Sequence, residues 1–254
     1  MADAVAEDAR SRNVKLLVEY DGTDFEGWQV QPGRRTVQKV LEEAIARAVG
    51  EEVSLLASGR TDSGVHAEGQ VANFRTDSRL PLERIVAAAN VRLPEDVVVL
   101  SAEDVALSFH ATHQAKWKTY RYRISRRKVR PVFGRRYELY LKRPLDVERT
   151  ERAAKHFVGT HDFNSFRSEM RKEKDTVRTI HSIWFEEKGE TLEIYYRGNG
   201  FLYMMLRIIT GTLIRVGLGR IEPNAIPAML AARDRKAAGP TAPPHGLCLV
   251  EVEY

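Results

Sequence analysis

Nine residues, Gly59-Arg-Thr-Asp-Ser-Gly-Val-His-Ala67, bring together a carboxylate, a guanidinium, two hydroxyls and an imidazole. They lie between two predicted strands, and loops held by a rigid scaffold are where catalytic groups concentrate. Asp62 supplies the carboxylate, which could act as a nucleophile or stabilise positive charge on a substrate. The alternative is a β-turn in which Asp62 accepts local backbone hydrogen bonds. The composition of the loop leaves both interpretations open.

The tripeptide Asp62-Ser63-Gly64 also matches the short signature of aspartic proteases. Those enzymes need two such carboxylates that share one proton. This sequence has one copy of the signature, so only a dimer could complete the pair. A protease would also have no use for the basic segment described below.

Arg207 interrupts the apolar run that extends from Phe201 to Ile209. An arginine within so apolar a helix is expected to be partly buried, and a buried charge without a partner is strongly destabilising. The sharper hypothesis pairs Arg207 with Asp62, which would keep that acid ionised and fix its orientation. The alternative is that the side chain snorkels to the edge of the helix.

Aromatic and basic residues interleave in the strand-like stretch Lys116–Arg123, which opens a strongly basic segment. Residues 116–143 hold twelve basic side chains and one acidic one, giving +11, whereas the 254-residue chain has a net charge of only +5. Cations neutralise phosphates, and exposed rings offer faces for unstacked bases. A half-buried strand would explain the first eight residues alone, but the continuing run favours nucleic acid. The candidate RNA-binding residues are Lys116, Lys118, Arg126, Arg127, Lys128 and Arg130.

Several classes of protein are excluded or disfavoured by composition. The single cysteine, Cys248, excludes an intrachain disulfide and a cysteine-based zinc site. His110 and His113 lack nearby metal ligands, so we interpret them as structural or RNA-facing. Neither a phosphate-binding loop nor a dinucleotide fingerprint occurs, so we expect no nucleotide cofactor. The absence of a secretory signal and of a long apolar span predicts a cytoplasmic protein with no membrane contact.

The elements that must position these residues form two similar series. Residues 1–13 are expected to be a flexible tail. The first half then predicts strand, helix, strand, strand, helix and strand, with Thr36 as a helix N-cap: 14–20, 37–49, 53–57, 71–75, 82–91 and 97–105. The second half predicts the same order with one extra helix before the last strand: 116–125, 146–158, 179–187, 191–197, 201–216, 221–233 and 247–254.

This repetition predicts an α+β protein of two fused ferredoxin-like β-α-β-β-α-β halves, residues 14–110 and 111–254. Their strands would form one continuous, mainly antiparallel sheet, with helices on one face and a central active-site cleft. The first half would carry the Asp62 loop and the second the basic segment.

The Gly59–Ala67 loop resembles the signature loop of the tRNA pseudouridine synthase A family, and other motifs recur in the order of that family. Together they span residues 14–254, and Ser63 is a departure because the family usually has alanine there. The further motifs are Tyr20–Gln29, Thr36–Gln38, Phe109–Ala111, His161–Phe163, Gly198–Phe201, Met205–Arg207, Thr241–Pro243 and Gly246–Leu247.

The resemblance implies isomerisation of uridine to pseudouridine at positions 38 to 40 of the tRNA anticodon stem–loop, by a homodimer without a metal or organic cofactor. It implies that Asp62 is the catalytic aspartate, supported by Arg60 and by Arg207 as its ion-pair partner. It further implies that Tyr120 stacks on the target base and that Leu247 lines the pocket. The alternative is a non-catalytic RNA-binding module of two RRM-like halves, which would have no use for the carboxylate-centred loop.

Overall fold

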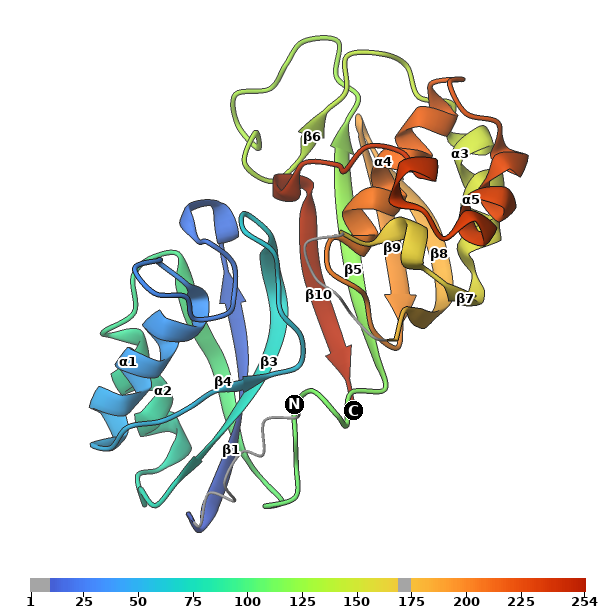
Figure 1. The fold of residues 1–254 in the computed structure, drawn as a ribbon. Helices are drawn as coiled ribbons and strands as arrows, with labels where there is room; N and C mark the ends of the chain where they lie inside the picture. Colours follow the sequence, from blue (N-terminus) through green and yellow to red (C-terminus); the bar gives the residue numbers. More distant parts are fainter. Residues whose placement is uncertain (1–9, 169–174) are drawn as a thin grey trace.

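The computed structural model describes residues 10–168 and 175–254 (Figure 1). The elements of the first half are β1 (Arg12–Tyr20), α1 (Val37–Val49), β2 (Leu56–Ala57), β3 (His66–Thr76), α2 (Leu82–Asn90) and β4 (Val97–Val105). Those of the second half are β5 (Trp117–Ser125), β6 (Leu139–Tyr140), α3 (Val147–Ala154), β7 (Gly159–Asp162), β8 (Val177–Lys188), β9 (Thr191–Gly198), α4 (Met205–Gly217), α5 (Ile226–Ala232) and β10 (Leu247–Glu253). Short 3-10 helices lie at Gly22–Asp24, Lys155–Phe157, Asn164–Phe166, Pro223–Ala225, Arg235–Ala237 and Pro244–Gly246.

Within the described ranges, ten strands form a single sheet with the order β4-β1-β3-β10-β5-β9-β8-β7, in which β2 also pairs with β3 and β6 with β5. The first half contributes β4-β1-β3-β2 and the second half contributes β10-β5-β9-β8. In both, the order is last, first, third and second strand, as the ferredoxin-like prediction requires. The predicted fold class is confirmed.

The two halves join where β3 and β10 pair in parallel, at His66 opposite Cys248 and Ala67 opposite Leu249. Gly69 permits this approach, because a Cβ atom there would lie 2.2 Å from the carbonyl oxygen of Val250. The remaining strand pairs of the main path are antiparallel. The parallel pair therefore makes one sheet of the two halves.

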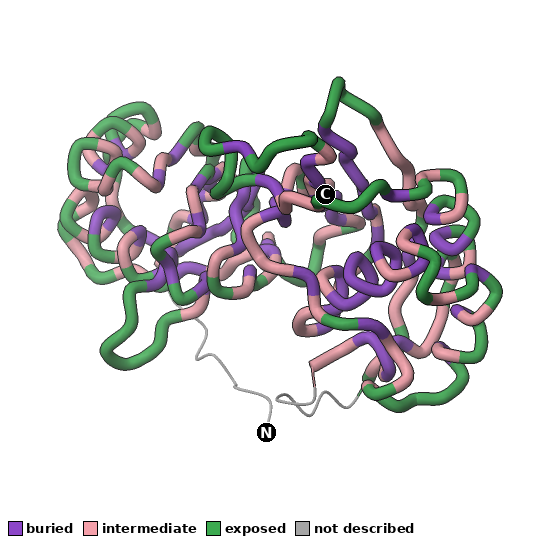
Figure 2. Tube along the Cα trace, turned by 90° about the horizontal axis from the view of Figure 1, so that it is seen from above, coloured by how far each residue is buried: buried purple, intermediate pink, exposed green. Residues whose placement is uncertain are grey.

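The helices of both halves cover the same face of this sheet. Across the junction, Tyr20 lies opposite Ala67, Ala67 opposite Leu249, and Leu249 opposite Tyr120. Directly paired residues share a face of a sheet, so these four side chains point to one side. All four belong to the same buried cluster, and Figure 2 shows the buried residues running through both halves.

Helix α1 illustrates how the apolar pattern builds this core. Val37, Leu41 and Ile45 are fully buried, as their helical spacing predicts. Thr36 is the N-cap residue, although its side chain makes no capping hydrogen bond, and Gly50 ends the helix in the left-handed conformation, with φ 82°. In the described parts of the chain, no helix is long and apolar enough to cross a membrane.

The structure corrects the predicted strands on either side of the Asp62 loop. Strand β3 begins at His66 rather than residue 71, because β10 pairs with His66 and Ala67, and β1 also pairs with Ala67. Strand β2 has two residues rather than five. Glu42 accepts the hydrogen bond of the Leu55 N–H, and Gln38 donates to the Leu55 carbonyl oxygen, so α1 occupies backbone groups that a longer strand would use.

The apolar run predicted as a helix from residue 201 begins its helix four residues later, at Met205. Met204 adopts a left-handed conformation, with φ 61°, which few residues other than glycine tolerate. The sharp turn leaves Phe201 free to pack against Tyr120, their ring centroids 5.4 Å apart. Hydrophobic periodicity does not reveal this turn, because the residues on both sides of it are apolar.

Other boundaries differ in smaller ways. The α-helix predicted over 146–158 ends at Ala154 and continues as a 3-10 turn, with Asp146 as its N-cap. The helix predicted over 221–233 divides into a 3-10 turn and α5, while the short strands β6 and β7 were not predicted. Strand β1 begins at Arg12, inside the predicted tail, whose first nine residues lie outside the described residues.

Candidate active site

Asp62 lies in the loop between β2 and β3, at the edge where the two halves meet. The Val65 N–H donates to the Asp62 carbonyl oxygen at 3.1 Å, so residues 62–65 form the turn that the simpler interpretation predicted. Gly64 has φ 75°, a value suited to glycine at the third position of such a turn. The turn and the catalytic interpretation are compatible, because the turn uses the backbone of Asp62.

The residues before α1 hold this loop from outside. The Trp28 N–H donates to the Thr61 carbonyl oxygen at 3.1 Å, and the Gly64 N–H donates to the Phe25 carbonyl oxygen at 3.2 Å. The Ser63 hydroxyl donates to the same Phe25 oxygen at 3.2 Å. Ser63, the departure from the family pattern, therefore adds a bond to a contact that the backbone already makes.

A buried polar network holds the loop from inside. The hydroxyls of Tyr20 and Thr61 lie 2.8 Å apart. Gln70 donates to the Gly59 carbonyl oxygen at 2.9 Å and accepts from the Ser58 hydroxyl at 2.8 Å. Burial raises the pKa of Tyr20 above its usual range, so its hydroxyl stays protonated at physiological pH. Hydrogen bonds therefore hold the backbone of the loop on both sides of Asp62.

Arg207, on the first turns of α4, forms an ion pair with Asp62, with 3.1 Å between Nη1 and Oδ2. The exposed fractions of the two side chains are 12% and 15%. Arg207 also donates from Nε to the Ala242 carbonyl oxygen at 2.9 Å, and the Ala242 N–H donates to the Arg207 carbonyl oxygen. The predicted pairing is present, and it joins residues 145 positions apart in the sequence. A guanidinium held in this way favours the ionised form of the carboxylate.

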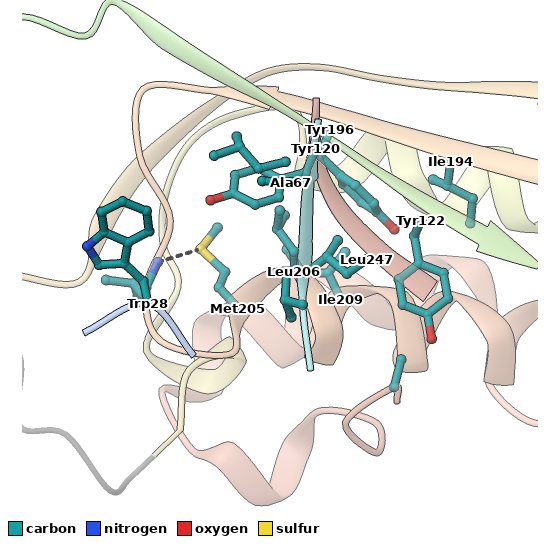
Figure 3. Packing of buried hydrophobic residues seen from close by; sticks show 14 of the residues in the cluster. Trp28, Ala67, Tyr120, Tyr122, Ile194, Tyr196, Met205, Leu206, Ile209 and Leu247 are labelled. Carbon is teal, nitrogen blue, oxygen red and sulfur yellow. Dashed lines mark hydrogen bonds between the residues drawn. The ribbon is translucent and has the colours of Figure 1, made fainter. Parts of the chain in front are cut away.

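Tyr120 and Leu247 both lie in the buried apolar cluster (Figure 3). Tyr120, on β5, is buried and packs perpendicular to Phe201, with an angle of 89° between the ring planes. Burial is the main cause that raises the pKa of Tyr120, and the nearby Asp62 carboxylate adds to it, so the ring carries a neutral hydroxyl. Leu247 begins β10 opposite Tyr122. A neutral aromatic ring therefore lies within electrostatic reach of the Asp62 carboxylate, and Leu247 belongs to the same apolar cluster as that ring.

Arg60 lies two residues before Asp62, and its side chain is exposed. Among the described residues, no ion pair or hydrogen bond involves it. The structure thus brings Asp62 and Arg207 into contact and leaves Arg60 at the surface of the same loop.

Lys118 was predicted to face RNA, and the structure contradicts this. Its side chain is buried on the same face as Tyr120, and its ammonium donates to the Ser58 carbonyl oxygen. Burial, with a smaller contribution from the positive charge of Arg178, lowers the pKa of Lys118 to about 8. Lys118 therefore supports the Asp62 loop through its hydrogen bond to the Ser58 carbonyl oxygen, just before that loop begins.

This burial predicts a specific dependence of stability on pH. The unfolded lysine has a pKa of 10.5 and the folded one about 8, so between these values the unfolded state binds more protons and stability rises with pH. Between pH 8 and 10.5, the free energy of unfolding of the wild type should increase by on the order of 3 kcal/mol more than that of Lys118→Met. Urea unfolding at several pH values measures this. The exposed Lys116→Met variant is the control, and a difference that is constant across the range contradicts the expectation.

The basic segment carries less free charge than its sequence suggests. Several of its arginines form ion pairs with acidic residues outside the segment. The pairs are Arg121 with Glu68 and Glu193, Arg123 with Glu193, Arg126 with Glu187, Arg127 with Glu190 and Arg136 with Asp24. In the described part of the chain, Lys116, Lys128 and Arg130 are exposed and form no ion pair.

Three contributors to the site were not identified from the sequence. Gln70 and Tyr20 form the network beneath the loop, and the Ala242 carbonyl oxygen orients Arg207. A buried glutamine or a carbonyl acceptor leaves no pattern in a single sequence.

Among the described residues, no group of three or more His, Cys, Asp or Glu side chains could hold a metal ion. His110 and His113 lie with ring centroids 4.1 Å apart.

Comparison with known proteins gives consistent results. A sequence model for a family described as tRNA pseudouridine synthase matches residues 16–138 and 153–254. The tRNA pseudouridine synthase A 2 of Clostridium perfringens (strain 13 / Type A) is 46% identical over 243 residues, which cover 96% of this chain and 100% of that protein. The tRNA pseudouridine synthase A of Bacillus pumilus (strain SAFR-032) is 49% identical over 243 residues, which cover 95% and 98% of the two chains.

Proposed function

Because the chain belongs to the tRNA pseudouridine synthase family and therefore isomerises uridine in tRNA to pseudouridine, we propose that its targets are positions 38, 39 and 40 of the anticodon stem–loop and that Asp62 is the catalytic carboxylate. The observation that carries the proposal is the ion pair between Asp62 and Arg207. It fixes a single carboxylate between the two halves, beside an aromatic ring and an apolar wall. A non-catalytic RNA-binding module would have no use for this arrangement.

The reaction requires little beyond such a carboxylate. The N-glycosidic bond of uridine breaks, the uracil turns, a bond forms between the sugar and carbon 5, and the proton of carbon 5 leaves while nitrogen 1 gains one. Asp62 can attack the sugar, add to the base or remove the proton, and each route needs the ionised form. Arg207 maintains that form and, because its Nε is bonded to Ala242, holds the carboxylate in one orientation.

Tyr120 and Leu247 have a clear use in this reaction. The detached uracil must turn without escaping, and we propose that it stacks on the ring of Tyr120 and packs against Leu247. Burial and the perpendicular contact with Phe201 hold the Tyr120 ring in one plane. Because the pKa of Tyr120 is raised, the ring brings no negative charge close to Asp62. Arg60, exposed on the same loop, is placed to contact the RNA around the target.

The target base must leave its stack, which costs a few kcal/mol, and phosphate contacts offset that cost. The ion pairs divide the predicted basic residues into two groups. Lys116, Lys128 and Arg130 are exposed, whereas Arg126 and Arg127 already face Glu187 and Glu190. We therefore assign the principal phosphate contacts to the first group.

This assignment predicts a difference in salt dependence. We expect the double variant Lys128→Gln/Arg130→Gln to bind the anticodon stem–loop with a weaker dependence on salt than the wild type. The slope of log Kd against log salt concentration should be lower by about 0.7–0.9 for each phosphate that the variant no longer neutralises. The matched double variant Arg126→Gln/Arg127→Gln should change the slope less, since each of its arginines has a carboxylate partner. Fluorescence anisotropy at several salt concentrations measures both. Equal slopes for Lys128→Gln/Arg130→Gln and the wild type would remove these residues from the RNA interface.

We further propose that the halves comprise residues 14–110 and 111–254, with the boundary in the connection between β4 and β5, and that the protein acts in the cytoplasm as a homodimer. The resemblance to the family supports the dimer, and a tRNA substrate supports the location. Light scattering at micromolar concentration tests the oligomeric state.

The positions of modification test the proposed function. Stem–loop transcripts that retain uridine at only one of positions 38, 39 and 40 should each gain pseudouridine when incubated with the wild-type protein. Chemical labelling of pseudouridine followed by primer extension locates the product. Transcripts with cytidine at all three positions serve as the control, and modification that persists in them contradicts the assignment.

A further inference from the structure

The segment 126–138 between β5 and β6, here the β5–β6 loop, carries exposed apolar side chains that the chemistry does not use. Phe133 is 90% exposed, Val129 is 78% exposed and Val132 is 64% exposed. Single exposed apolar residues are ordinary on protein surfaces, whereas several gathered on one loop mark a contact surface. Phe133 is the largest of them and lies at the centre of the segment.

Cations surround these apolar residues. Lys128, Arg130 and Arg135 are exposed and, within the described residues, have no ion-pair partner. The one acid of the loop, Glu138, is buried and accepts a hydrogen bond from the Thr191 hydroxyl. The exposed part of the loop is therefore apolar and positively charged, without an acidic side chain.

The base of the loop is fixed to the first half of the protein. The Tyr137 hydroxyl donates to Asp21 Oδ2 at 2.8 Å. The His66 ring bridges the two segments, with Nδ1 3.0 Å from the Gly22 nitrogen and Nε2 2.9 Å from the Arg136 carbonyl oxygen. The loop thus begins in the second half and is bonded to the first.

These bonds attach the C-terminal end of the β5–β6 loop to His66, in the Gly59–Ala67 loop that carries Asp62. His66 follows Asp62 by four residues, and Arg136 follows Phe133 by three. Figure 1 shows the β5–β6 loop at the end of the sheet where β10 begins with Leu247.

We propose that Phe133 stacks on an unpaired base of the stem–loop next to the target uridine, while Arg130 and Arg135 neutralise the flanking phosphates. The inference rests on the proposed function and adds a contact outside the reacting centre. An aromatic face between cations is how proteins hold single-stranded bases, because stacking and phosphate neutralisation act together.

The test compares Phe133→Ala and Phe133→Trp with the wild type. Phe133→Ala should bind the anticodon stem–loop about 10-fold more weakly, as expected for removal of one base stack, with an unchanged slope of log Kd against log salt because no charge is removed. Phe133→Trp should restore the affinity. Val91→Ala, which alters a side chain that is 84% exposed at the end of α2, is the matched control and should bind as the wild type does.

Two results would overturn the inference. The first is an unchanged Kd for Phe133→Ala, and the second is a shift from dimer to monomer, which would assign Phe133 to contact with a second copy. Pseudouridine formation by the wild type is measured in parallel. If the wild type is active and Phe133→Ala binds normally, only this inference fails, whereas an inactive wild type would overturn the proposed function.

Discussion

Replacement of Asp62 by asparagine should reduce the rate of pseudouridine formation by about 10⁴-fold or more, while tRNA affinity stays within about threefold of the wild type. Asparagine has nearly the shape of aspartate and can still accept the hydrogen bond from Arg207, so the loop keeps its geometry. It cannot supply the negative charge that each route of the reaction requires. Single-turnover rates and equilibrium binding to the same transcript separate chemistry from affinity.

The control for this variant is Asp104→Asn. Asp104 also forms an ion pair with an arginine, Arg12, but lies on β4 at the outer edge of the sheet. Removal of this pair should leave the rate unchanged. Substantial turnover by Asp62→Asn would remove Asp62 from its catalytic role, and an equal decrease in both variants would indicate a general effect of removing a carboxylate.

Arg207→Gln is the variant with the second largest expected effect. It should lower kcat by about 10²–10³-fold with little change in KM, because it leaves Asp62 in place without a fixed orientation or a neutralising charge. It should also lower the free energy of unfolding by about 2–3 kcal/mol, since it leaves a mostly buried carboxylate without its cation. Steady-state kinetics and urea unfolding measure the two effects.

A double-mutant cycle tests whether these effects arise from the ion pair. Asp62→Asn/Arg207→Gln should be less destabilised than the sum of the two single variants, because it contains neither unpaired charge. Additive decreases in stability would mean that the two side chains act independently, as they would if Arg207 extended to solvent at the edge of α4. Arg207→Lys should recover part of kcat, since it keeps the charge but cannot make the planar contact with Ala242.

The ion pair was predictable because each partner is unusual in its own segment. An arginine within an apolar run requires a partner, and Asp62 is the acid of a loop rich in functional groups. The order of helices and strands likewise predicted two ferredoxin-like halves. The apolar alternation of β5 even placed Lys118 on the face of Tyr120 and Tyr122, although its basic neighbours led us to assign it to RNA.

What the sequence did not predict depends on contacts between distant segments. Strand β10 pairs with the first residues of β3, whereas β2 pairs with β3 further along, so β3 begins earlier than predicted. Nothing in the residues around His66 indicates that β10 lies there. The ion pairs of Arg121 with Glu68 and of Arg126 with Glu187 depend on the order of the sheet, since these acids lie on β3 and β8, each one strand beyond a neighbour of β5. A count of charges along the chain therefore overestimated the cationic surface.

Release of tritium from carbon 5 of a labelled target uridine tests the central claim most directly, since the proton of that carbon leaves only if the glycosidic bond is remade there. The anticodon stem–loop, labelled at one of positions 38 to 40, is incubated with the wild type, with Asp62→Asn and with Asp104→Asn. Our interpretation predicts release by the wild type and Asp104→Asn and none by Asp62→Asn, although all three bind the transcript. No release by a wild-type protein that binds the stem–loop, or equal release by Asp62→Asn, would contradict it.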